Sequence, residues 1–280
     1  MSTLQAIVIA ILQGATELFP ISSLGHAVVL PALLNWNLDQ RSPEFLPFLV
    51  LLHTGTAVAL FLYFWRDWLG LLTGVVGVGG PERTAEARQL ALLIVIATIP
   101  AVVLGYGANH FFRSLFAAPL FVCAFLVLNG LLLLFGERLR GATTGRTRAL
   151  SSMTMVDALV IGLWQCGALF PGISRAGATM VGGLLRGFNH VDSARFSFLI
   201  ALPIIVGATV LEVPHLLHAS VPSGVLQQAM IAAVLAGITA YLATAFLMRY
   251  FREHDNWALS PFAIYCLVFG AGSAAYLMLR

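Results

Sequence analysis

Long apolar runs separated by short polar connections dominate this chain of 280 residues. A helix needs about 20 apolar residues to cross the hydrocarbon core of a bilayer. Six runs reach that length, and we interpret each as a membrane-spanning helix; they cover residues 46–65, 89–108, 115–135, 196–214, 226–248 and 259–279. The pattern therefore predicts an all-α, polytopic membrane protein.

Two further apolar regions, 4–35 and 155–187, do not fit this description because polar residues, Gly and Pro interrupt each near its middle. The interruptions read FPISSLGH in the first region and FPGISRAGA in the second. Two short apolar arms with a polar tip are typical of a re-entrant helix–loop–helix. Such a backbone is tolerated at membrane depth where protein or a water-filled cavity satisfies its polar groups.

The two broken regions resemble each other. Residues 13–22 read QGATELFPIS and residues 165–174 read QCGALFPGIS, and three predicted spans follow each segment. Three crossings are an odd number, so the second half enters the membrane upside down. We therefore predict an inverted-topology repeat within one membrane domain, with halves 1–149 and 150–280 and a site where the broken segments meet. The alternative is a chance similarity between two apolar segments that contain proline.

Composition supports the membrane assignment. Hydrophobic residues make up 59% of the chain and charged residues 10%, whereas soluble domains carry about 25% charged residues. The net charge is +3, and every basic residue is an arginine. The arginines are scattered between apolar runs instead of forming a stripe, so no nucleic-acid partner is expected. The three cysteines, Cys123, Cys166 and Cys266, lie in apolar surroundings and are interpreted as packing residues.

The arginines predict the orientation of the chain in the membrane. Arg66, Arg83, Arg88, Arg138, Arg140, Arg146, Arg148, Arg186, Arg195, Arg249 and Arg252 fall on one side of the predicted topology. The other side receives only Arg41, Arg113 and Arg280. By the positive-inside rule the first group is cytoplasmic. The first hairpin then enters from outside, and the second enters from the cytoplasm.

Two ionisable residues, Glu17 and Arg175, are predicted within the membrane, where each costs roughly 2.5 to 3.5 kcal/mol on insertion scales. A buried ion pair that ties the two halves together is one explanation. Further polar residues in the same tips have separate structural explanations. Ser22 and Ser23 are typical helix N-caps after Pro20, and His26 taken alone would be a hydrogen-bonded interior histidine. An ion pair alone leaves His26, Ser22, Ser23, Ser174 and Thr179 without a function.

Taken together, these residues match the requirements of a divalent cation and a phosphate group. Gln13 and Glu17 are four residues apart and share one helix face, where their oxygens could hold Mg²⁺. Arg175 offers a planar fork for phosphate oxygens. Neutral donors come from Ser174, Thr179 and the amide groups near Gly172 and Gly177, at the start of a predicted helix.

His26 lies beside Ser22 and Ser23 and supplies a nucleophile or an acid–base group near neutral pH. A cation, an arginine, amide donors and a base are the parts used in phosphoryl transfer. A phosphate ester handled inside the membrane implies a lipid substrate. The sequence leaves open whether His26, a serine hydroxyl or a metal-bound water attacks phosphorus.

The two polar segments resemble motifs of the bacterial undecaprenyl-diphosphate phosphatases. QGATELFPISSLGH is similar to the [E/Q]xxxE…PxSSxGH element of that family, and PGISRAGAT at 171–179 is similar to its PGxSRSxxT element. The resemblance covers essentially the whole chain, including FWR at 64–66 and PFAIY at 261–265. It implies removal of the terminal phosphate from a polyprenyl diphosphate carrier, which recycles the carrier for peptidoglycan synthesis and underlies bacitracin resistance.

The resemblance also implies dependence on Mg²⁺ or Ca²⁺ and an active site open to the outer face of the bacterial cytoplasmic membrane. The expected partners are the lipid substrate and the bilayer, and a second copy of the chain is a candidate for a homodimer. Carried over by position, the catalytic set is Glu17, Ser23, His26 and Arg175. The substrate set is Ser22, Gly172, Ser174, Gly177 and Thr179, and the metal ligands are Gln13 and Glu17.

This chain departs from the family pattern at three positions. Gln13 replaces the commoner Glu and so removes one negative charge, while Leu24 and Ala176 each lack a hydroxyl that is usual there. His53 lies early in the first full span, where it either reaches the site from the outer side or is an ordinary buried histidine. The alternative function is a transporter or flippase of the same lipid, because inverted repeats and broken helices suit transport equally well.

Overall fold

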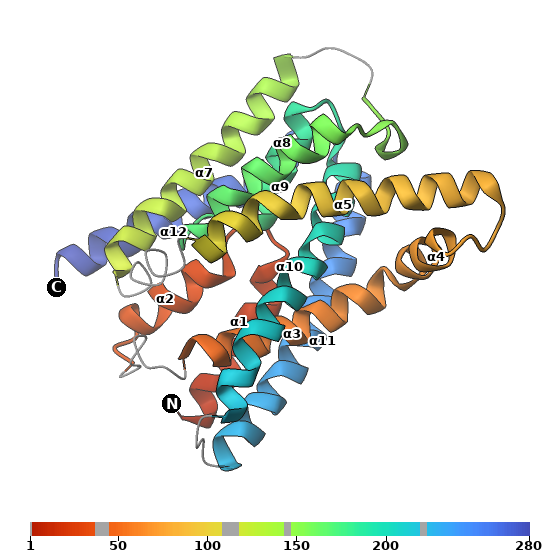
Figure 1. Ribbon diagram of the computed structural model, residues 1–280. Coiled ribbons are helices and arrows are strands. Elements are labelled where there is room, and N and C mark those ends of the chain that lie inside the picture. Colours follow the sequence, from red (N-terminus) through yellow and green to blue (C-terminus); the bar gives the residue numbers. More distant parts are fainter. Residues whose placement is uncertain (1, 37–44, 108–117, 143–146, 219–222) are drawn as a thin grey trace.

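The described part of the chain is built from helices joined by short connections (Figure 1). The computed structural model describes residues 2–36, 45–107, 118–142, 147–218 and 223–280. The α-helices are α1 (Thr3–Glu17), α2 (Ser23–Leu33), α3 (Phe45–Tyr63), α4 (Trp65–Val75), α5 (Pro81–Gly107), α7 (Pro119–Ala142), α8 (Met155–Cys166), α9 (Arg175–Leu185), α10 (His190–His218), α11 (Ser223–Glu253) and α12 (Ser260–Met278). Two 3₁₀ turns, η1 (Leu150–Ser152) and η2 (Gly167–Leu169), complete the described elements.

Six helical regions correspond to the six predicted spans. Helices α5, α7, α10, α11 and α12 each contain a stretch long and apolar enough to cross a membrane. Residues Phe48–Tyr63 of α3 reach that length only together with α4, and the chain bends by 76° between them. The described chain is therefore a multi-pass membrane protein with five such helices and one bent pair.

The region between residues 66 and 88 differs from the prediction, which treated it as a connection. It contains α4 and the first turns of α5, and α4 packs against α5. Helix α4 is amphipathic, with Trp65, Leu69 and Leu72 exposed. A search for long apolar runs misses such a helix, because its polar face lowers the mean hydropathy.

Each predicted re-entrant region is a pair of short helices. In the first pair, Pro20 follows α1 and disfavours helical geometry in the residue before it. Ser22 has a positive φ of 68°, and its Oγ accepts a hydrogen bond from Gly25 N as the N-cap of α2. In the second pair, Ser174 Oγ accepts from Gly177 N and caps α9. Both caps lie beside the polar tips.

The first arm of each pair packs against a long helix of the other half of the chain. Helix α1 packs on α11 and α8 packs on α5, while α3 packs on α10 and α7 on α12. Glycine permits the first two contacts, since a Cβ on Gly14 would lie 2.2 Å from the Ala236 carbonyl oxygen. A Cβ on Gly162 would lie 2.5 Å from the Ala97 carbonyl oxygen. These helices therefore approach each other backbone to backbone.

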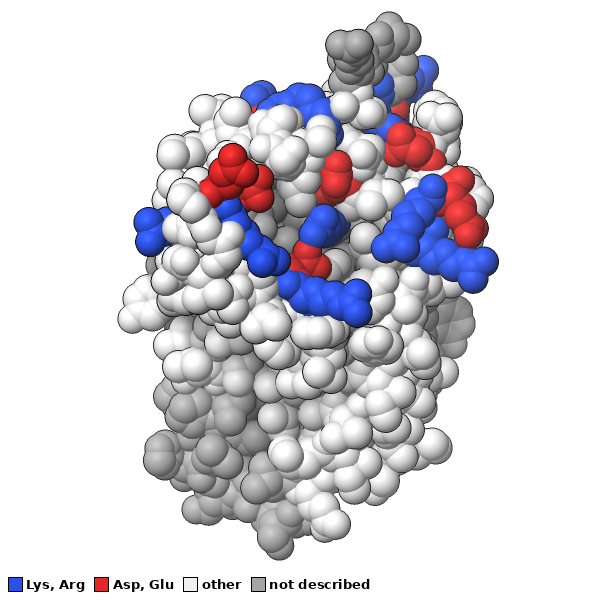
Figure 2. All heavy atoms as spheres, turned by 90° about the vertical axis from the view of Figure 1, so that its right-hand side faces the viewer, with Lys and Arg blue, Asp and Glu red and all other residues white. Residues whose placement is uncertain are grey.

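Charged side chains gather at one end of the molecule. Figure 2 shows Arg, Asp and Glu over the upper part of the face that carries α4 and the start of α5. The buried Asp157 pairs there with Arg148 at 2.7 Å and with Arg186 at 2.6 Å. Arg195 of α10 pairs with Asp67 of α4 at the same end. Predicted cytoplasmic arginines thus share an end, whereas Arg41, Arg113 and Arg146 lie outside the described residues.

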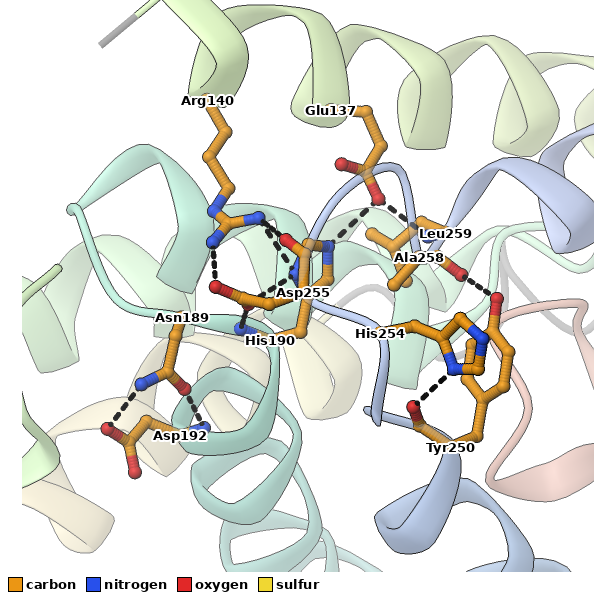
Figure 3. A network of polar contacts seen from close by, with 10 residues as sticks. All are labelled: Glu137, Arg140, Asn189, His190, Asp192, Tyr250, His254, Asp255, Ala258 and Leu259. Atoms are coloured by element: carbon orange, nitrogen blue, oxygen red, sulfur yellow. Dashed lines mark hydrogen bonds and ion pairs between the residues drawn. The ribbon is translucent and has the colours of Figure 1, made fainter. Parts of the chain in front are cut away.

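A second polar network joins α7, α10 and the connection before α12 (Figure 3). His190 is fully buried, and its Nε2 lies 2.9 Å from Glu137 Oε1 while its Nδ1 lies 3.0 Å from Asp255 Oδ1. Glu137 Oε1 also accepts a hydrogen bond from Leu259 N, just ahead of α12. Arg140 donates to Asp255 Oδ2 at 2.5 Å. We call these residues, Glu137, Arg140, His190 and Asp255, the Glu137 cluster.

Candidate active site

A cavity of about 430 Å³ opens where the tips of the two helix pairs meet. Its polar lining includes Glu17, Ser22, Ser23, His53, Gln165, Ser174 and Arg175. Five of these residues belong to the sequence-predicted site. The other five predicted residues do not line the cavity; they are Gln13, His26, Gly172, Gly177 and Thr179.

Glu17, the last residue of α1, is the centre of the polar lining. Its Oε2 accepts hydrogen bonds from Ser23 Oγ at 2.5 Å and from Gln13 Nε2 at 2.9 Å. His53 Nε2 lies 3.2 Å from the same oxygen, and Arg175 Nη2 lies 3.5 Å from Oε1. A carboxylate that is only 8% exposed is therefore compensated by donors from four segments of the chain.

Arg175 is the first residue of α9 and reaches the cavity from the second helix pair. One guanidinium nitrogen donates to the Ser197 carbonyl oxygen at 3.2 Å, and the other faces Glu17. Thr179 supports this turn of α9, because its hydroxyl bonds the Arg175 carbonyl oxygen at 2.8 Å and lies 2.6 Å from Ser197 Oγ. Arg175 keeps donor capacity toward the cavity, which it lines together with Ser174.

His53 is the histidine whose side chain lines this cavity. Its Nδ1 is 2.7 Å from the Leu49 carbonyl oxygen of the preceding helical turn, which turns Nε2 toward Glu17. The sequence left two alternatives for His53, which either reaches the site from the outer side or is an ordinary buried histidine. The structure brings it to Glu17.

His26 has a different environment. Both ring nitrogens are engaged, Nδ1 with the Ser22 carbonyl oxygen at 2.6 Å and Nε2 with the Tyr265 hydroxyl at 2.7 Å. The ring stacks on Phe269 at a centroid distance of 4.8 Å and is 2% exposed. His26 is close to Ser22 and Ser23 in the motif, but its side chain packs against α12, because the helical turn that begins at Ser23 directs it away from the cavity.

The two predicted glycines define backbone geometry. Gly172 has a φ of 112°, and a Cβ there would lie 2.6 Å from the Val122 carbonyl oxygen. Only glycine meets both conditions. The amide of Gly177, predicted to be a free donor, is instead bonded to Ser174 Oγ as the cap of α9. Its N–H therefore serves the helix start.

Asn129 of α7 joins the two tips, and sequence reasoning missed it. Its Nδ2 donates to the Pro20 carbonyl oxygen at 2.8 Å, and its Oδ1 accepts from Ser174 N at 2.9 Å. Asn129 is fully buried. The available signal was a single amide in the otherwise apolar run LFVCAFLVLNGLLLLF, where a polar side chain needs partners.

The remaining wall of the cavity is apolar. Helix α5 supplies Ala101 and Val102, and α10 supplies Ile204, Ile205 and Ala208. These residues belong to the C-terminal halves of α5 and α10, away from the arginine-bearing start of each helix. Val102 is 51% exposed although it lines the cavity, so the cavity is open along α5. The cavity therefore joins a charged centre to an apolar flank.

Comparison with known families identifies the group to which these motifs belong. The family described as "Bacitracin resistance protein BacA" matches residues 6–272. This chain belongs to the BacA family. A protein of Granulibacter bethesdensis named undecaprenyl-diphosphatase is 61% identical, over 99% of this chain and 97% of that relative.

Other BacA-family relatives carry the same name. The protein of Acidiphilium cryptum is 56% identical over 97% of this chain and 96% of its own length. That of Gluconobacter oxydans is 49% identical over the full length of both chains. The family resemblance inferred from the two polar motifs is thereby confirmed.

The residues around Glu17 include the two that the sequence predicts as ligands of a divalent cation. No group of three or more His, Cys, Asp or Glu side chains within the described ranges could hold a metal ion. The oxygen donors are the Glu17 carboxylate and Gln13 Oε1, a buried atom without a hydrogen-bond partner among the described residues. Mg²⁺ keeps several waters and binds one or two carboxylates together with substrate phosphates. This donor set fits a cation that binds together with a diphosphate.

Proposed function

We propose that this BacA-family chain hydrolyses undecaprenyl diphosphate to undecaprenyl monophosphate and inorganic phosphate at the cavity around Glu17. The observation that carries the proposal is one cavity that combines a carboxylate, a guanidinium, an imidazole and serine hydroxyls with an apolar flank. The polar groups match a diphosphate, and the flank between α5 and α10 matches the isoprenoid chain. The names of the relatives support the same reaction.

Ser23 and Glu17 form the reacting pair in this proposal. The Ser23 hydroxyl already donates to Glu17 Oε2, which is the arrangement of a nucleophile beside its base. Ser23 Oγ attacks the terminal phosphorus, its proton passes to Glu17, and the bond to the lipid monophosphate breaks. Water then attacks the phosphoserine: its oxygen joins the departing phosphate with one proton, its other proton restores the Ser23 hydroxyl, and Glu17 passes the proton it accepted to the departing phosphate.

Arg175 binds the non-bridging oxygens of the terminal phosphate and stabilises the charge that develops on them. His53 holds Glu17 in place through its Nε2. Glu17 and Gln13 are the residues expected to hold Mg²⁺ or Ca²⁺, which when bound supplies further positive charge against the diphosphate. Ser22 and Ser174 offer hydroxyl groups at the cavity wall.

We also propose the inverted repeat and the orientation predicted above. Reciprocal packing of α1 on α11 and α8 on α5 supports a two-fold relation between the halves. The charged end supports a cytoplasmic location for that end in the bacterial inner membrane, with the cavity open to the outside. A membrane-impermeant thiol reagent should not label a Ser151→Cys variant in intact cells, and labelling there would contradict the orientation.

Phosphate release by the purified protein tests the reaction. Detergent-solubilised protein with Mg²⁺ should release phosphate from undecaprenyl diphosphate, and excess chelator should stop it. Glu17→Gln should lower turnover by roughly 1,000-fold, since it removes the base and a cation ligand. Glu82→Gln, an exposed carboxylate at the start of α5, is the matched control.

Two outcomes would contradict this proposal. Full activity in excess chelator would remove the cation from the mechanism. Transfer of labelled lipid across a vesicle membrane without any phosphate release would favour the transporter function instead.

A further inference from the structure

Asn129, in the middle of α7, is a polar residue that the mechanism above does not use. It is fully buried and does not line the cavity. Its Nδ2 donates to the Pro20 carbonyl oxygen at 2.8 Å, and its Oδ1 accepts from Ser174 N at 2.9 Å. A carbonyl oxygen only accepts and a backbone N–H only donates, so one orientation of the amide satisfies both contacts. The side chain therefore binds the backbone of one tip through its nitrogen and that of the other tip through its oxygen.

The two backbone groups that Asn129 binds lie close in the chain to the reacting side chains. Ser174 directly precedes Arg175, the first residue of α9. Pro20 lies three residues ahead of Ser23, the first residue of α2. The positions from which the guanidinium and the hydroxyl reach the cavity therefore depend on where the two tips are held.

A second hydrogen bond joins the tips directly. Ser174 Oγ donates to the Phe19 carbonyl oxygen at 3.2 Å. Asn129 binds the next carbonyl along the chain, that of Pro20. Consecutive carbonyl groups of the first tip are thus bound by the second tip and by α7. The start of α9, and with it Arg175, is tied to the first tip through Ser174 and Asn129 together.

The face of α7 that carries Asn129 supports both tips. Asn129 follows Leu126 by three residues and Val122 by seven, so the three side chains share one face of the helix. A Cβ on Gly172 of the second tip would lie 2.6 Å from the Val122 carbonyl oxygen. A Cβ on Gly25 of α2 would lie 3.1 Å from Leu126 Cδ2. Both helix pairs therefore rest directly on this face, to which Asn129 adds hydrogen bonds.

We propose that Asn129 is a positioning residue for the reaction. By holding both tips on one side chain, it sets where Ser23 Oγ lies relative to the Arg175 guanidinium. Attack requires the phosphorus bound by Arg175 to lie within reach of that oxygen, and a misplacement of about 1 Å can cost a factor of about 100 in rate. This inference rests on the proposed function for the identity of the reaction.

Substitution of Asn129 tests the proposal in purified protein, with turnover of undecaprenyl diphosphate expressed per folded molecule. Asn129→Leu removes both hydrogen bonds at similar volume and should lower kcat about 100-fold. KM should stay within about threefold of wild type, since the apolar flank that holds the lipid is unchanged. Asn129→Asp has the same shape and keeps the acceptor for Ser174 N, so it should lower kcat only about 10-fold.

Thr244→Val is the control for the loss of a buried polar group. Thr244 is a fully buried residue of α11, and its hydroxyl donates to the Ala240 carbonyl oxygen within the same helix. It does not line the cavity. Its substitution should leave kcat per folded molecule unchanged, and thermal unfolding in detergent gives the folded fraction of every variant.

A double-mutant cycle with Arg175→Lys distinguishes positioning from a general loss of structure. Once the guanidinium is removed, Asn129→Leu should lower kcat by less than about threefold, because the group that it positions is already lost. Equal factors in both backgrounds would overturn the proposal, and so would wild-type kcat in the folded Asn129→Leu protein. If Asn129→Leu does not fold, the same cycle is run with Asn129→Asp, whose effect should also shrink beside Arg175→Lys, and an equal effect in both backgrounds would overturn the proposal.

Failure of this inference differs from failure of the reaction. Wild-type protein that releases no phosphate from undecaprenyl diphosphate would contradict the proposed function. Active wild-type protein together with an equally active Asn129→Leu variant would contradict only the positioning role of Asn129.

Discussion

Two buried carboxylates, Glu17 and Glu137, each meet a histidine from a distant segment of the chain, and an arginine stands beside each group. Glu17 has His53 at 3.2 Å and Arg175 at 3.5 Å, and Glu137 has His190 at 2.9 Å. In the Glu137 cluster, Arg140 binds the second carboxylate, Asp255, and both acids share His190 (Figure 3). Both places contain a glutamate, a histidine and an arginine, and the Glu137 cluster adds Asp255.

The surroundings of the two groups differ. Glu17, Ser23, His53 and Arg175 line a cavity, and the side-chain oxygens of Gln13 and Gln165 have no hydrogen-bond partner among the described residues. Glu137, His190 and Asp255 do not line that cavity, and Glu137 instead accepts a hydrogen bond from the Leu259 amide ahead of α12. A buried group of glutamate, histidine and arginine can therefore either take part in a reaction or stabilise the fold. An adjoining cavity and nearby polar atoms without partners distinguish the first case from the second.

The largest expected difference concerns the two arginines. Arg175→Lys keeps the charge but loses the planar fork, so turnover should fall at least roughly 100-fold while the protein still folds and inserts. Arg140→Lys removes a similar fork from Asp255 and should leave the rate per folded molecule unchanged. Turnover and thermal stability in detergent are measured for both. An Arg175→Lys variant that unfolds early yet keeps its rate would make Arg175 structural.

The histidines should differ by a smaller factor. His53→Gln removes the partner that holds Glu17, and turnover should fall about 10- to 100-fold, as expected when a group that orients a functional ligand is lost. His26→Gln should mainly lower the unfolding temperature, because both ring nitrogens are already engaged by protein groups, the Ser22 carbonyl oxygen and the Tyr265 hydroxyl, and His26 does not line the cavity. If the His26 variant loses more turnover per folded molecule, His26 and not His53 is the histidine of the reaction.

The smallest effects are expected at the Glu137 cluster and concern stability. His190→Gln breaks a fully buried contact between two carboxylates and should cost roughly 1 to 3 kcal/mol of unfolding free energy, with turnover unchanged. A loss of turnover larger than the unfolded fraction of the variant explains would contradict a purely structural role for His190.

Acid should weaken the same cluster. Burial acts to raise the pKa of Asp255, but hydrogen bonds from His190 and Arg140 outweigh it and hold that pKa below the ordinary value of 3.8. A lowered folded pKa gives stability that is fully present above the ordinary value and is lost as the pH falls through the folded one. Wild type should therefore lose more stability below about pH 4 than Asp255→Asn does, and equal losses in thermal unfolding scans would contradict this.

The sequence predicted the long helices and both broken segments, since apolar length and internal proline act locally. It also brought Glu17, Ser23 and Arg175 to one place through the resemblance of the two segments. It could not predict features that depend on contacts between distant segments. The orientation of the His26 side chain depends on its contact with Tyr265 of α12. The hydrogen bonds of Asn129 depend on Pro20 and Ser174, which lie in the tips of the two helix pairs and not in α7.

The amphipathic helix α4 was missed for another reason. Its apolar residues are spaced around one face, so no uninterrupted run marks it, and the bend that precedes it has no proline in the sequence YFWRDW. The Glu137 cluster was missed because its acids lie in connections that read as solvated ends of spans. Nothing in the local sequence distinguishes a carboxylate that meets His190 from one that faces water.

The contact of α1 with α11 has a consequence for how the chain is made. Gly14 rests against the backbone at Ala236, so the surface that receives the first arm is among the last parts of the chain to leave the ribosome. The first arm of the second pair, α8, packs on α5, which precedes it in the chain and is synthesised before it. A chain truncated ahead of α11 therefore contains Glu17 but lacks the helix against which α1 packs. The first half is thus not a unit that can complete its own fold.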